Sequence, residues 1–430
     1  MEHEPCHGKT EMSAGTTKPS PPPAEDATPA SKVFGDGNLL GEILHRVDSP
    51  TTLVRAALAS KRWLRAASGR AFLRRFRERH PPRLVGFYVT GDCVHRPEFV
   101  PMPPGTELIG AALRRAGSLF DAFPPCSSRV WHTRNSRVLF DFSRVLFDPR
   151  SFAVCDPLRH PPREAAMAEA ELPPPPAACE HAMLLPDDDD DDDATCYCVE
   201  VNHDGRSVAA EVSVLRSGAW AVLCCAKAEL AWPPEQIPMI TLLAGGKVYM
   251  VAVAGYLVAV DLATASLFAV ELPKGVTYEY YGNLVPSRGD DSVLHLFHVA
   301  GDRLRVWRRR MDDGAGAGEW ALRDTVSVKE TCGHLVEQGS DPADGDPLLP
   351  VSVVGVGDNA EFAFLELGYS GNIVVYLHLG SRKAEKVYNR DPDNDEIIEV
   401  HPLFTVWPPV FPAPALGTDE HEELHLGNTN

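Results

Sequence analysis

Few residues of this sequence have the types and spacing that enzymatic chemistry needs. The segment AGGKV, Ala244–Val248, contains the Gly-Gly-Lys of a phosphate-binding loop, but Val248 stands where such a loop needs Ser or Thr. In GYSGN, Gly371 directly follows Ser370, so the G-x-S-x-G pattern of a nucleophilic serine is absent. The sixteen histidines include no HExxH pair for zinc. The sequence therefore predicts a chain that is no enzyme and holds no cofactor or metal.

Isolated histidines and acidic runs have structural explanations. His295 and His298 fall on a predicted strand, where a lone histidine is a core residue more often than a ligand. Asp187–Asp193 is a run of seven aspartates without the glycine turn of a calcium loop. In DPDND, Asp391–Asp395, the next residue is Glu396 where an EF-hand needs glycine, and position twelve is Pro402. Calcium binding is not expected at either site.

Composition indicates an intracellular protein of more than one domain. The chain has 430 residues, a formal net charge of −19 and 44% hydrophobic residues. Its N-terminus, MEHEPCHGKTE, has no apolar h-region, and the longest apolar run, Val248–Val260, is too short to cross a bilayer. The ten cysteines form no CxxC pair, which favours reduced thiols. We expect a cytoplasmic or nuclear location and no membrane partner.

Low-complexity segments mark the expected domain boundaries. Residues 1–31 are rich in Pro, Ser and Thr and predict a disordered tail, and residues 413–430 predict a second flexible tail. The Pro-rich and acidic residues 161–194 predict a disordered insertion. Between these segments we expect a helical domain at residues 32–80 and a β-rich domain at residues 84–412. The expected fold class is α+β and multidomain.

Residues 36–80 have helical periodicity. Leu39, Leu40, Ile43, Leu44 and Val47 form one apolar stripe, which Asp36 can cap. Ser49 and Pro50 provide a second helix start, and its stripe comprises Leu53, Val54, Ala57 and Leu58. Two further short apolar faces consist of Trp63, Leu64 and Ala67, and of Phe72, Leu73 and Phe76. A cluster this small usually needs a partner or a neighbouring domain.

The stretch NLLGEILHRVDSPTTLVRAALASKRWLRAASGRAFLRRF resembles an F-box, the helical motif that binds the Skp-type adaptor of Skp–cullin–F-box ubiquitin ligases. The chain has VFGDGN where the family usually opens with Leu-Pro, and Ser60 where it usually has Cys. The resemblance implies adaptor binding, and through the adaptor a cullin, by the apolar residues Leu39, Leu40, Ile43, Leu44, Val47, Pro50, Leu53, Val54, Ala57, Trp63 and Leu64.

Positive charge is concentrated in the same stretch. Residues 53–76 carry seven Lys or Arg and no acid. The arginines would lie at the rim of the adaptor interface, where charges speed encounter while buried apolar anchors provide affinity. Solvated arginines that cover apolar neighbours are the simpler interpretation for each residue taken singly. Nucleic-acid binding is not expected, because the rest of the chain is acidic and would repel a polyanion.

From residue 84 onward the periodicity is two, with recurrent turn residues. Three stretches share a plan of strand, turn, strand, turn, strand: GGKVYMVAVAGYLVAVDLATASLFAVELP, SVLHLFHVAGDRLRVWRRR with GEWALRDTVSV, and EFAFLELGYSGNIVVYLHLGSRKAEKVY. SFAVCDPLRHPPR reads as the end of an earlier copy. Repeated three-strand units predict a β-propeller with six or seven blades.

These units resemble the F-box-associated, kelch-like propellers of plant F-box proteins, particularly those of grasses. The segments that carry the resemblance are VCDPLRHPPR, LAGGKVYM and SRKAEKVY with FTVWPPVFP. The two resemblances together imply a substrate-receptor subunit of a Skp–cullin–F-box ubiquitin ligase, whose propeller loops recruit an unidentified target protein. The alternative is an interaction scaffold that is no longer coupled to a ligase.

One local repeat is unusual. SRVLFDF, Ser136–Phe142, is followed at once by SRVLFDP, Ser143–Pro149. Because strand side chains alternate with period two, an insertion of seven residues would exchange the two faces. We therefore expect a turn or bulge between the copies, and a tandem duplication without functional meaning accounts for them.

Overall fold

The computed structural model describes residues 37–91, 96–102, 110–124, 127–143, 151–159, 170–176, 182–186, 194–204, 206–230, 237, 240–253, 255–290, 292–311, 318–336, 350–368, 373–389, 399–406, 409 and 411. The chain divides into two compact units. One unit spans Pro82–Pro408, and the other holds the four helices between residues 37 and 81. Of the helices in the described part of the chain, none has the length and apolarity needed to cross a membrane.

The helical unit consists of short helices that follow one another closely: α2 (Gly37–His45), α3 (Pro50–Ala57), α4 (Lys61–Ala67) and α5 (Arg70–Arg79). The predicted start of α3 is confirmed, since Ser49 Oγ accepts the N–H of Thr52 at 3.2 Å and Pro50 lies in the first turn. The predicted cap Asp36 lies outside the described residues. Helix α4 contacts α2, α3 and α5, so it lies at the centre of the unit.

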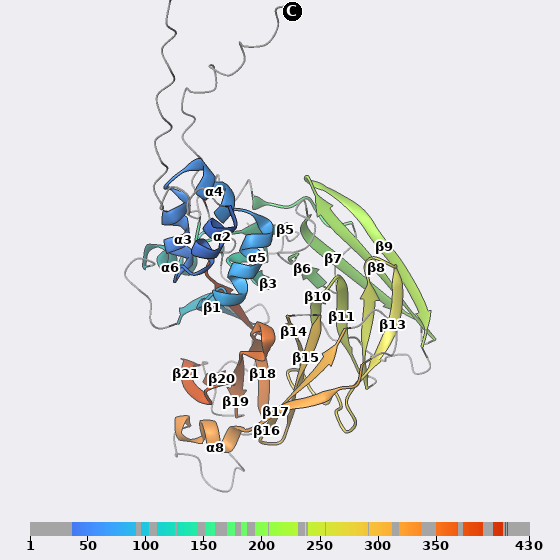
Figure 1. The fold of residues 1–430 in the computed structure, drawn as a ribbon. Coiled ribbons are helices and arrows are strands. Elements are labelled where there is room, and N and C mark those ends of the chain that lie inside the picture. The colour runs from blue at the N-terminus through green and yellow to red at the C-terminus, as the bar shows by residue number, and fades with distance from the viewer. Residues whose placement is uncertain are drawn as a thin grey trace, which may run out of the picture. The chain divides into compact units, whose positions relative to one another are not determined.

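The larger unit is a six-bladed β-propeller, built in its described part from six antiparallel sheets (Figure 1). The first two sheets have three strands each: β22 (Glu399–Phe404), β1 (Leu84–Thr90) and β2 (Glu98–Pro101), then β3 (Ser128–Arg134), β4 (Arg137–Phe142) and β5 (Ser151–Cys155). The third has β6 (Ala182–Leu184), β7 (Ala194–His203), β8 (Ser207–Arg216) and β9 (Ala219–Glu229).

The other three sheets also have four strands each. The fourth comprises β10 (Thr241–Ala244), β11 (Lys247–Ala252), β12 (Tyr256–Asp261) and β13 (Ser266–Glu271). The fifth comprises β14 (Leu284–Gly289), β15 (Val293–Ala300), β16 (Arg303–Arg310) and β17 (Ala321–Ser327). The sixth comprises β18 (Val351–Val356), β19 (Phe362–Leu367), β20 (Ile373–His378) and β21 (Lys383–Asn389). Short helices α6 (Gly110–Gly117) and α8 (Val328–Cys332) lie between strands.

The innermost strands form a closed ring. Strand β22 contacts β3, β3 contacts β6, and the contacts continue through β10, β14 and β18 back to β22. Strand β22 also pairs with β1, in register from Leu84–Phe404 to Thr90–Glu399. The first blade therefore joins the beginning of the propeller to its end. Strands β18 and β22 approach closely, because a Cβ added to Gly355 would lie 2.6 Å from the carbonyl oxygen of Val400.

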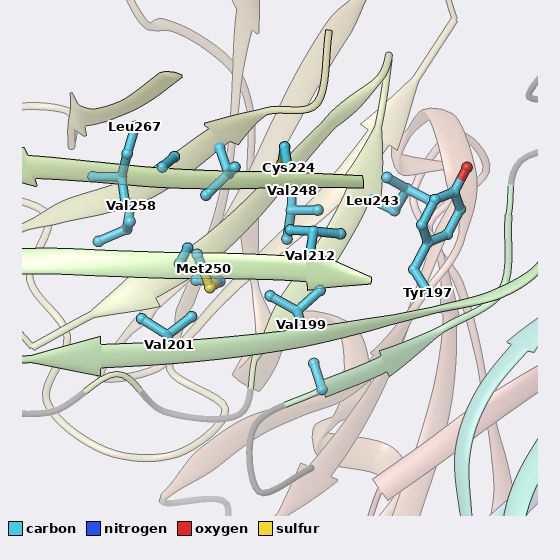
Figure 2. Close-up of a cluster of buried hydrophobic side chains, with 14 of the residues drawn as sticks. Tyr197, Val199, Val201, Val212, Cys224, Leu243, Val248, Met250, Val258 and Leu267 are labelled. Atoms are coloured by element: carbon cyan, nitrogen blue, oxygen red, sulfur yellow. The ribbon is translucent and has the colours of Figure 1, made fainter. Parts of the chain in front are cut away.

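The core lies between the faces of neighbouring blades. Val199, Val212, Val248, Met250 and Val258 point into the layer shared by the third and fourth blades (Figure 2). The intervening residues of the fourth blade, including Tyr249, Val251 and Leu257, pack against the fifth blade. Both faces of β11 and β12 are thus buried, since strand side chains alternate between two covered faces. This double burial explains the apolar run Val248–Val260.

The predicted helical cluster followed by a propeller is confirmed, and the number of blades is six. The predicted three-strand units are confirmed as β11–β13, β15–β17 and β19–β21, and β5 ends an earlier blade as expected. The sequence missed the inner strands β10, β14 and β18. Strand β10 has only four residues, and β14 contains Pro286 and Gly289, so neither has a clear alternation.

The predicted disorder of residues 161–194 is wrong for a short part of this range. Within the expected disordered insertion at residues 161–194, Ala182–Leu184 form β6, the inner strand of the third blade, and all three are buried. Glu171 also bridges to Ala153 at the edge of β5. Composition did not reveal this strand, because its short apolar run lies between proline-rich and aspartate-rich residues. The aspartate run Asp187–Asp193 and most of the second SRVLFD copy lie outside the described residues, and the first copy forms β4.

Candidate functional site

The predicted adaptor-binding residues occupy three different environments in the helical unit. Leu40, Leu44, Leu53 and Ala57 are buried, with at most 2% exposure. Leu39 is 45% exposed. The remaining predicted residues are half-buried: Ile43, Val47, Pro50, Val54, Trp63 and Leu64. The four buried residues belong to the interior of the folded chain, so only the other seven predicted residues are accessible to a partner.

Sequence reasoning left Leu58 out of the predicted contact set. Leu58 follows the last turn of α3 and is 64% exposed, the most exposed of the large hydrophobic residues in the described part of the chain. Its position at the end of the apolar stripe Leu53, Val54 and Ala57 indicated a possible contact residue. The stripe alone, however, does not distinguish a buried position from an exposed one. We call the accessible apolar residues of the helical unit, Leu39, Leu58 and the six half-buried residues, the apolar docking face.

The surface of the helical unit is strongly basic. Residues 37–81 contain ten Lys or Arg and three Asp or Glu. Eight of the basic residues are exposed: Arg46, Arg55, Lys61, Arg62, Arg65, Arg74, Arg75 and Arg79. Arg75 forms an ion pair with Glu42 at 3.7 Å, between two exposed side chains. Such a surface favours an acidic partner and speeds its association.

Ser60 caps α4. Its side chain accepts the N–H of Trp63 at 3.2 Å, and its backbone is extended, as an N-cap residue requires. We expect Ser60→Ala to lower the free energy of unfolding of the helical unit by about 1 kcal/mol. Circular dichroism of wild type and variant during thermal unfolding would measure this. Ser68→Ala, at the other end of α4, is the control and should change little; equal effects of both substitutions would contradict the capping role.

A charged network lies at the end of the inner strands of the propeller. Asp358, in the short 3-10 helix η4 (Asp358–Ala360), pairs with Arg134 of β3 at 2.7 Å and with Arg288 of β14 at 3.4 Å. Ser287 Oγ also donates to the carbonyl oxygen of Gly357 at 2.7 Å. These bonds connect the second, fifth and sixth blades, and they bring together residues more than 200 positions apart.

The helix η4 has an unusual backbone. Asn359 and Ala360 both have positive φ, 58° and 48°, although neither is glycine. Asn359 is held in place by Asp290, whose N–H donates to Asn359 Oδ1 at 2.6 Å and whose Oδ2 accepts from Asn359 Nδ2 at 2.7 Å. Residues in this region cost about 1–3 kcal/mol each and are concentrated at ligand-binding sites.

Beside η4 lies a pocket of about 300 Å³ between the fifth and sixth blades. It is lined by residues of β16, β17, η4 and the turn after β20: Val306, Arg323, Asp324, Asn359, Ala360, Glu361, His378, Leu379 and Gly380. The sequence did not predict this pocket, because its residues come from four segments that only the closed propeller brings together.

A second polar cluster lies at the start of the inner strands. Glu399 of β22 accepts from Arg129 of β3 at 3.1 Å and from Tyr281 at 2.6 Å, and His401 lies 3.6 Å from its other oxygen. Burial would raise the pKa of Glu399, but His401, Arg129 and Tyr281 together lower it to about 2. The carboxylate therefore stays charged and connects three separate segments of the ring. Within the described residues no group of three His, Cys, Asp or Glu is placed to hold a metal ion.

The propeller matches a known family. The family model described as "F-box protein AT5G49610-like, beta-propeller" covers residues 129–411, more than half of the chain. The chain belongs to this F-box protein family. The match begins in β3, so the helices of residues 37–81 lie before the matched range of the F-box family propeller.

Two solved structures have weak similarity to this F-box family member. A structural genomics protein of unknown function from Bacteroides thetaiotaomicron is 11% identical, with 67% of this chain and 63% of that chain covered and a TM-score of 0.37. For TolB from Acinetobacter baumannii the identity is 12%, the coverage 68% and 62%, and the TM-score 0.31. The chain thus spans less than two thirds of these structures, and such a likeness says nothing about function. No curated protein matches the chain.

Three histidines of the F-box family propeller have lowered pKa values. Burial, with help from Arg134, lowers the pKa of His132 to about 3, and Nδ1 of this ring accepts the N–H of Leu185 at 3.1 Å. Burial and the guanidinium groups of Arg323 and Arg308 lower the pKa of His295 to about 4, while Asp290 opposes them. His298 shifts in the same direction. The lowered pKa values of all three favour uncharged rings at neutral pH.

Their lowered pKa values predict a loss of stability in mild acid. Below pH 6.5 His132 and His295 become protonated in the unfolded chain, whereas in the folded chain they stay neutral until pH 4 or lower. The free energy of unfolding therefore falls as the pH falls through this window. At pH 5 each histidine should lower the free energy of unfolding by about 2 kcal/mol relative to neutral pH. Calorimetry of wild type and His295→Gln would test this. The variant should lose less stability between pH 7 and pH 5, and identical pH profiles would contradict the assignment.

Proposed function

We propose that this chain is the substrate-receptor subunit of a Skp–cullin–F-box ubiquitin ligase. The observation that carries the proposal is the order of its parts: a basic helical unit with two exposed leucines, Leu39 and Leu58, precedes a propeller of an F-box protein family. The helical unit would bind a Skp-type adaptor and through it a cullin. The propeller would hold a target protein.

The apolar docking face supplies the anchors for this interaction. Leu39 and Leu58 are exposed, and Trp63 is half-buried on the neighbouring helix α4. Large apolar and aromatic side chains at the centre of an interface usually contribute most of the affinity. The surrounding arginines would form the rim and orient an acidic adaptor surface. Leu40, Leu44, Leu53 and Ala57 would support the face from below instead of contacting the partner.

The catalytic contribution of such a subunit is proximity. Holding a target beside the ubiquitin-charged enzyme raises the effective concentration of its lysines, which converts a bimolecular encounter into an intramolecular one. The reaction then takes place on the partner enzyme. No side chain of this chain needs to exchange a proton or form a covalent bond.

Titration calorimetry with a purified plant Skp-type adaptor tests the proposal. Wild type should bind, and Leu58→Asp should weaken binding at least about 10-fold, because it places a charge on the apolar docking face. Leu322→Asp is a matched control, since Leu322 is an exposed leucine of the propeller at 51% exposure. This variant should bind like wild type.

Two outcomes would contradict the proposal in different ways. No binding by folded wild type would remove the ligase role and favour the alternative of an uncoupled propeller scaffold. Binding that survives Leu58→Asp together with Leu39→Asp would retain the ligase role but show that the adaptor uses another surface.

A further inference from the structure

The pocket between the fifth and sixth blades has an apolar floor and a polar mouth. Val306, Ala360 and Leu379 are buried at its base. Arg323 and Glu361 are exposed at its edge, and Asp324, Asn359 and His378 are half-buried. A volume of about 300 Å³ is enough for one long side chain with part of its backbone.

Several polar groups of the lining are already occupied by the protein. Arg382 pairs with Asp324 Oδ1, which also accepts the N–H of Thr325. Arg323 Nη1 donates to the carbonyl oxygen of Asn359 at 2.6 Å and lies 3.1 Å from Nε2 of His295. These bonds fix Asp324 and Arg323, and they leave the other N–H groups of Arg323 without a partner among the described residues.

Two further lining groups have open hydrogen-bonding capacity. Among the described residues the carboxylate of Glu361 has no ion pair, although its backbone accepts the N–H of Leu379 at 2.9 Å. His378 Nδ1 accepts the N–H of Ser381 at 3.0 Å, which leaves Nε2 as the ring nitrogen that can donate a hydrogen bond. The mouth therefore offers donors on Arg323 and His378, and acceptors on Glu361 and Asp324 Oδ2.

This arrangement selects among ligand classes. A carboxylate or phosphate would meet the donors but would be repelled by Glu361, whereas Arg382 already compensates the charge of Asp324. A purely apolar side chain would fill the floor but leave the carboxylate of Glu361 without a counter-charge. A Lys or Arg side chain satisfies both parts. Its aliphatic stem can lie on Val306, Ala360 and Leu379, and its charged end can pair with Glu361. The peptide carbonyl groups beside it can accept from Arg323 and His378.

We propose that this pocket binds a lysine or arginine side chain of a partner protein, with the flanking peptide backbone. The strained residues Asn359 and Ala360 of η4 hold the pocket wall in a preformed shape, which lowers the entropy cost of binding. The inference rests on the proposed function to the extent that the partner is the ligase target. The pocket itself can be tested without any adaptor.

The experiment uses the full chain with labelled valine and leucine methyl groups, observed by NMR. Nα-acetyl-lysine N-methylamide and the corresponding arginine compound should shift the methyl signals of Val306 and Leu379. The norleucine compound, which has the same stem without the charge, should bind about 5-fold more weakly. The glutamate compound should leave these signals unchanged.

Glu361→Gln should remove the preference for lysine over norleucine and leave norleucine binding as it was. Glu330→Gln is the matched control, because Glu330 is exposed on α8 and does not line the pocket. Equal binding of lysine and norleucine, preference for glutamate, or no shift with any probe would each overturn the proposal. None of these outcomes would affect adaptor binding, so failure of this inference is distinct from failure of the ligase proposal.

Discussion

Val400→Asp is expected to unfold the propeller at temperatures where wild type remains folded. Val400 is 4% exposed and lies in β22, opposite Val89 of β1 and packed with Phe87 and Phe364. A carboxylate there has no counter-charge on the apolar side chains around it, and Gly355 leaves no room for the backbone to move away. The free energy of unfolding should fall by about 3–5 kcal/mol, a large part of the 5–15 kcal/mol of a typical domain.

Val222→Asp is the matched control for this substitution. Val222 is 56% exposed on β9, the outer strand of the third blade, so the same chemical change should alter stability by about 0.5 kcal/mol or less. Scanning calorimetry would compare both variants with wild type. A Val400→Asp protein as stable as Val222→Asp would show that β22 is not needed to close the ring.

Leu44→Asp should unfold the helical unit while the propeller keeps its own unfolding transition. Leu44 has no exposed surface and lies on α2, which contacts both α4 and α5. Burying a charge at this position should cost about 3–5 kcal/mol, more than a unit of this size can lose. Hydrogen exchange should therefore show loss of protection in residues 37–79, and adaptor binding should disappear with the fold.

A comparison of Leu44→Asp with Leu58→Asp distinguishes a residue that stabilises the helical unit from one that contacts the adaptor. Leu58→Asp should keep the helices protected and weaken only the adaptor interaction, because Leu58 is exposed. Leu44→Asp should lose both. Normal helical protection in Leu44→Asp would mean that this side chain is not part of the interior that holds the helices together.

The sequence predicted the repetitive parts of the fold best. Strands such as β11, β12, β15 and β16 alternate or are continuously apolar and are separated by short turns, so periodicity located them. Strand β6 was not predicted, because three apolar residues between proline and aspartate runs are too few for a periodic signal. The blades that it completes were still recognisable from their outer strands.

The candidate sites were much less predictable. An apolar stripe identified α2 and α3, but burial of Leu44 and exposure of Leu58 depend on where neighbouring helices lie. The Asp358 network depends on Arg134, 224 residues earlier, and the pocket depends on four segments between residues 306 and 380. No spacing rule connects residues so distant, since only ring closure sets their separation.

Closure of the ring by β22 has a consequence for the order in which the protein forms during synthesis. Arg83 N–H bonds to Thr405 Oγ1 across 322 positions, and β1 has no inner neighbour until β22 has been made. Blades two to six can assemble as they leave the ribosome, because the strands of each are consecutive in the chain. The first blade must wait for nearly the last residues, with β1 and β2 exposed to chaperones meanwhile. The helices α2 to α5 are translated about 320 residues before β22, so they can fold while the propeller is still an open arc.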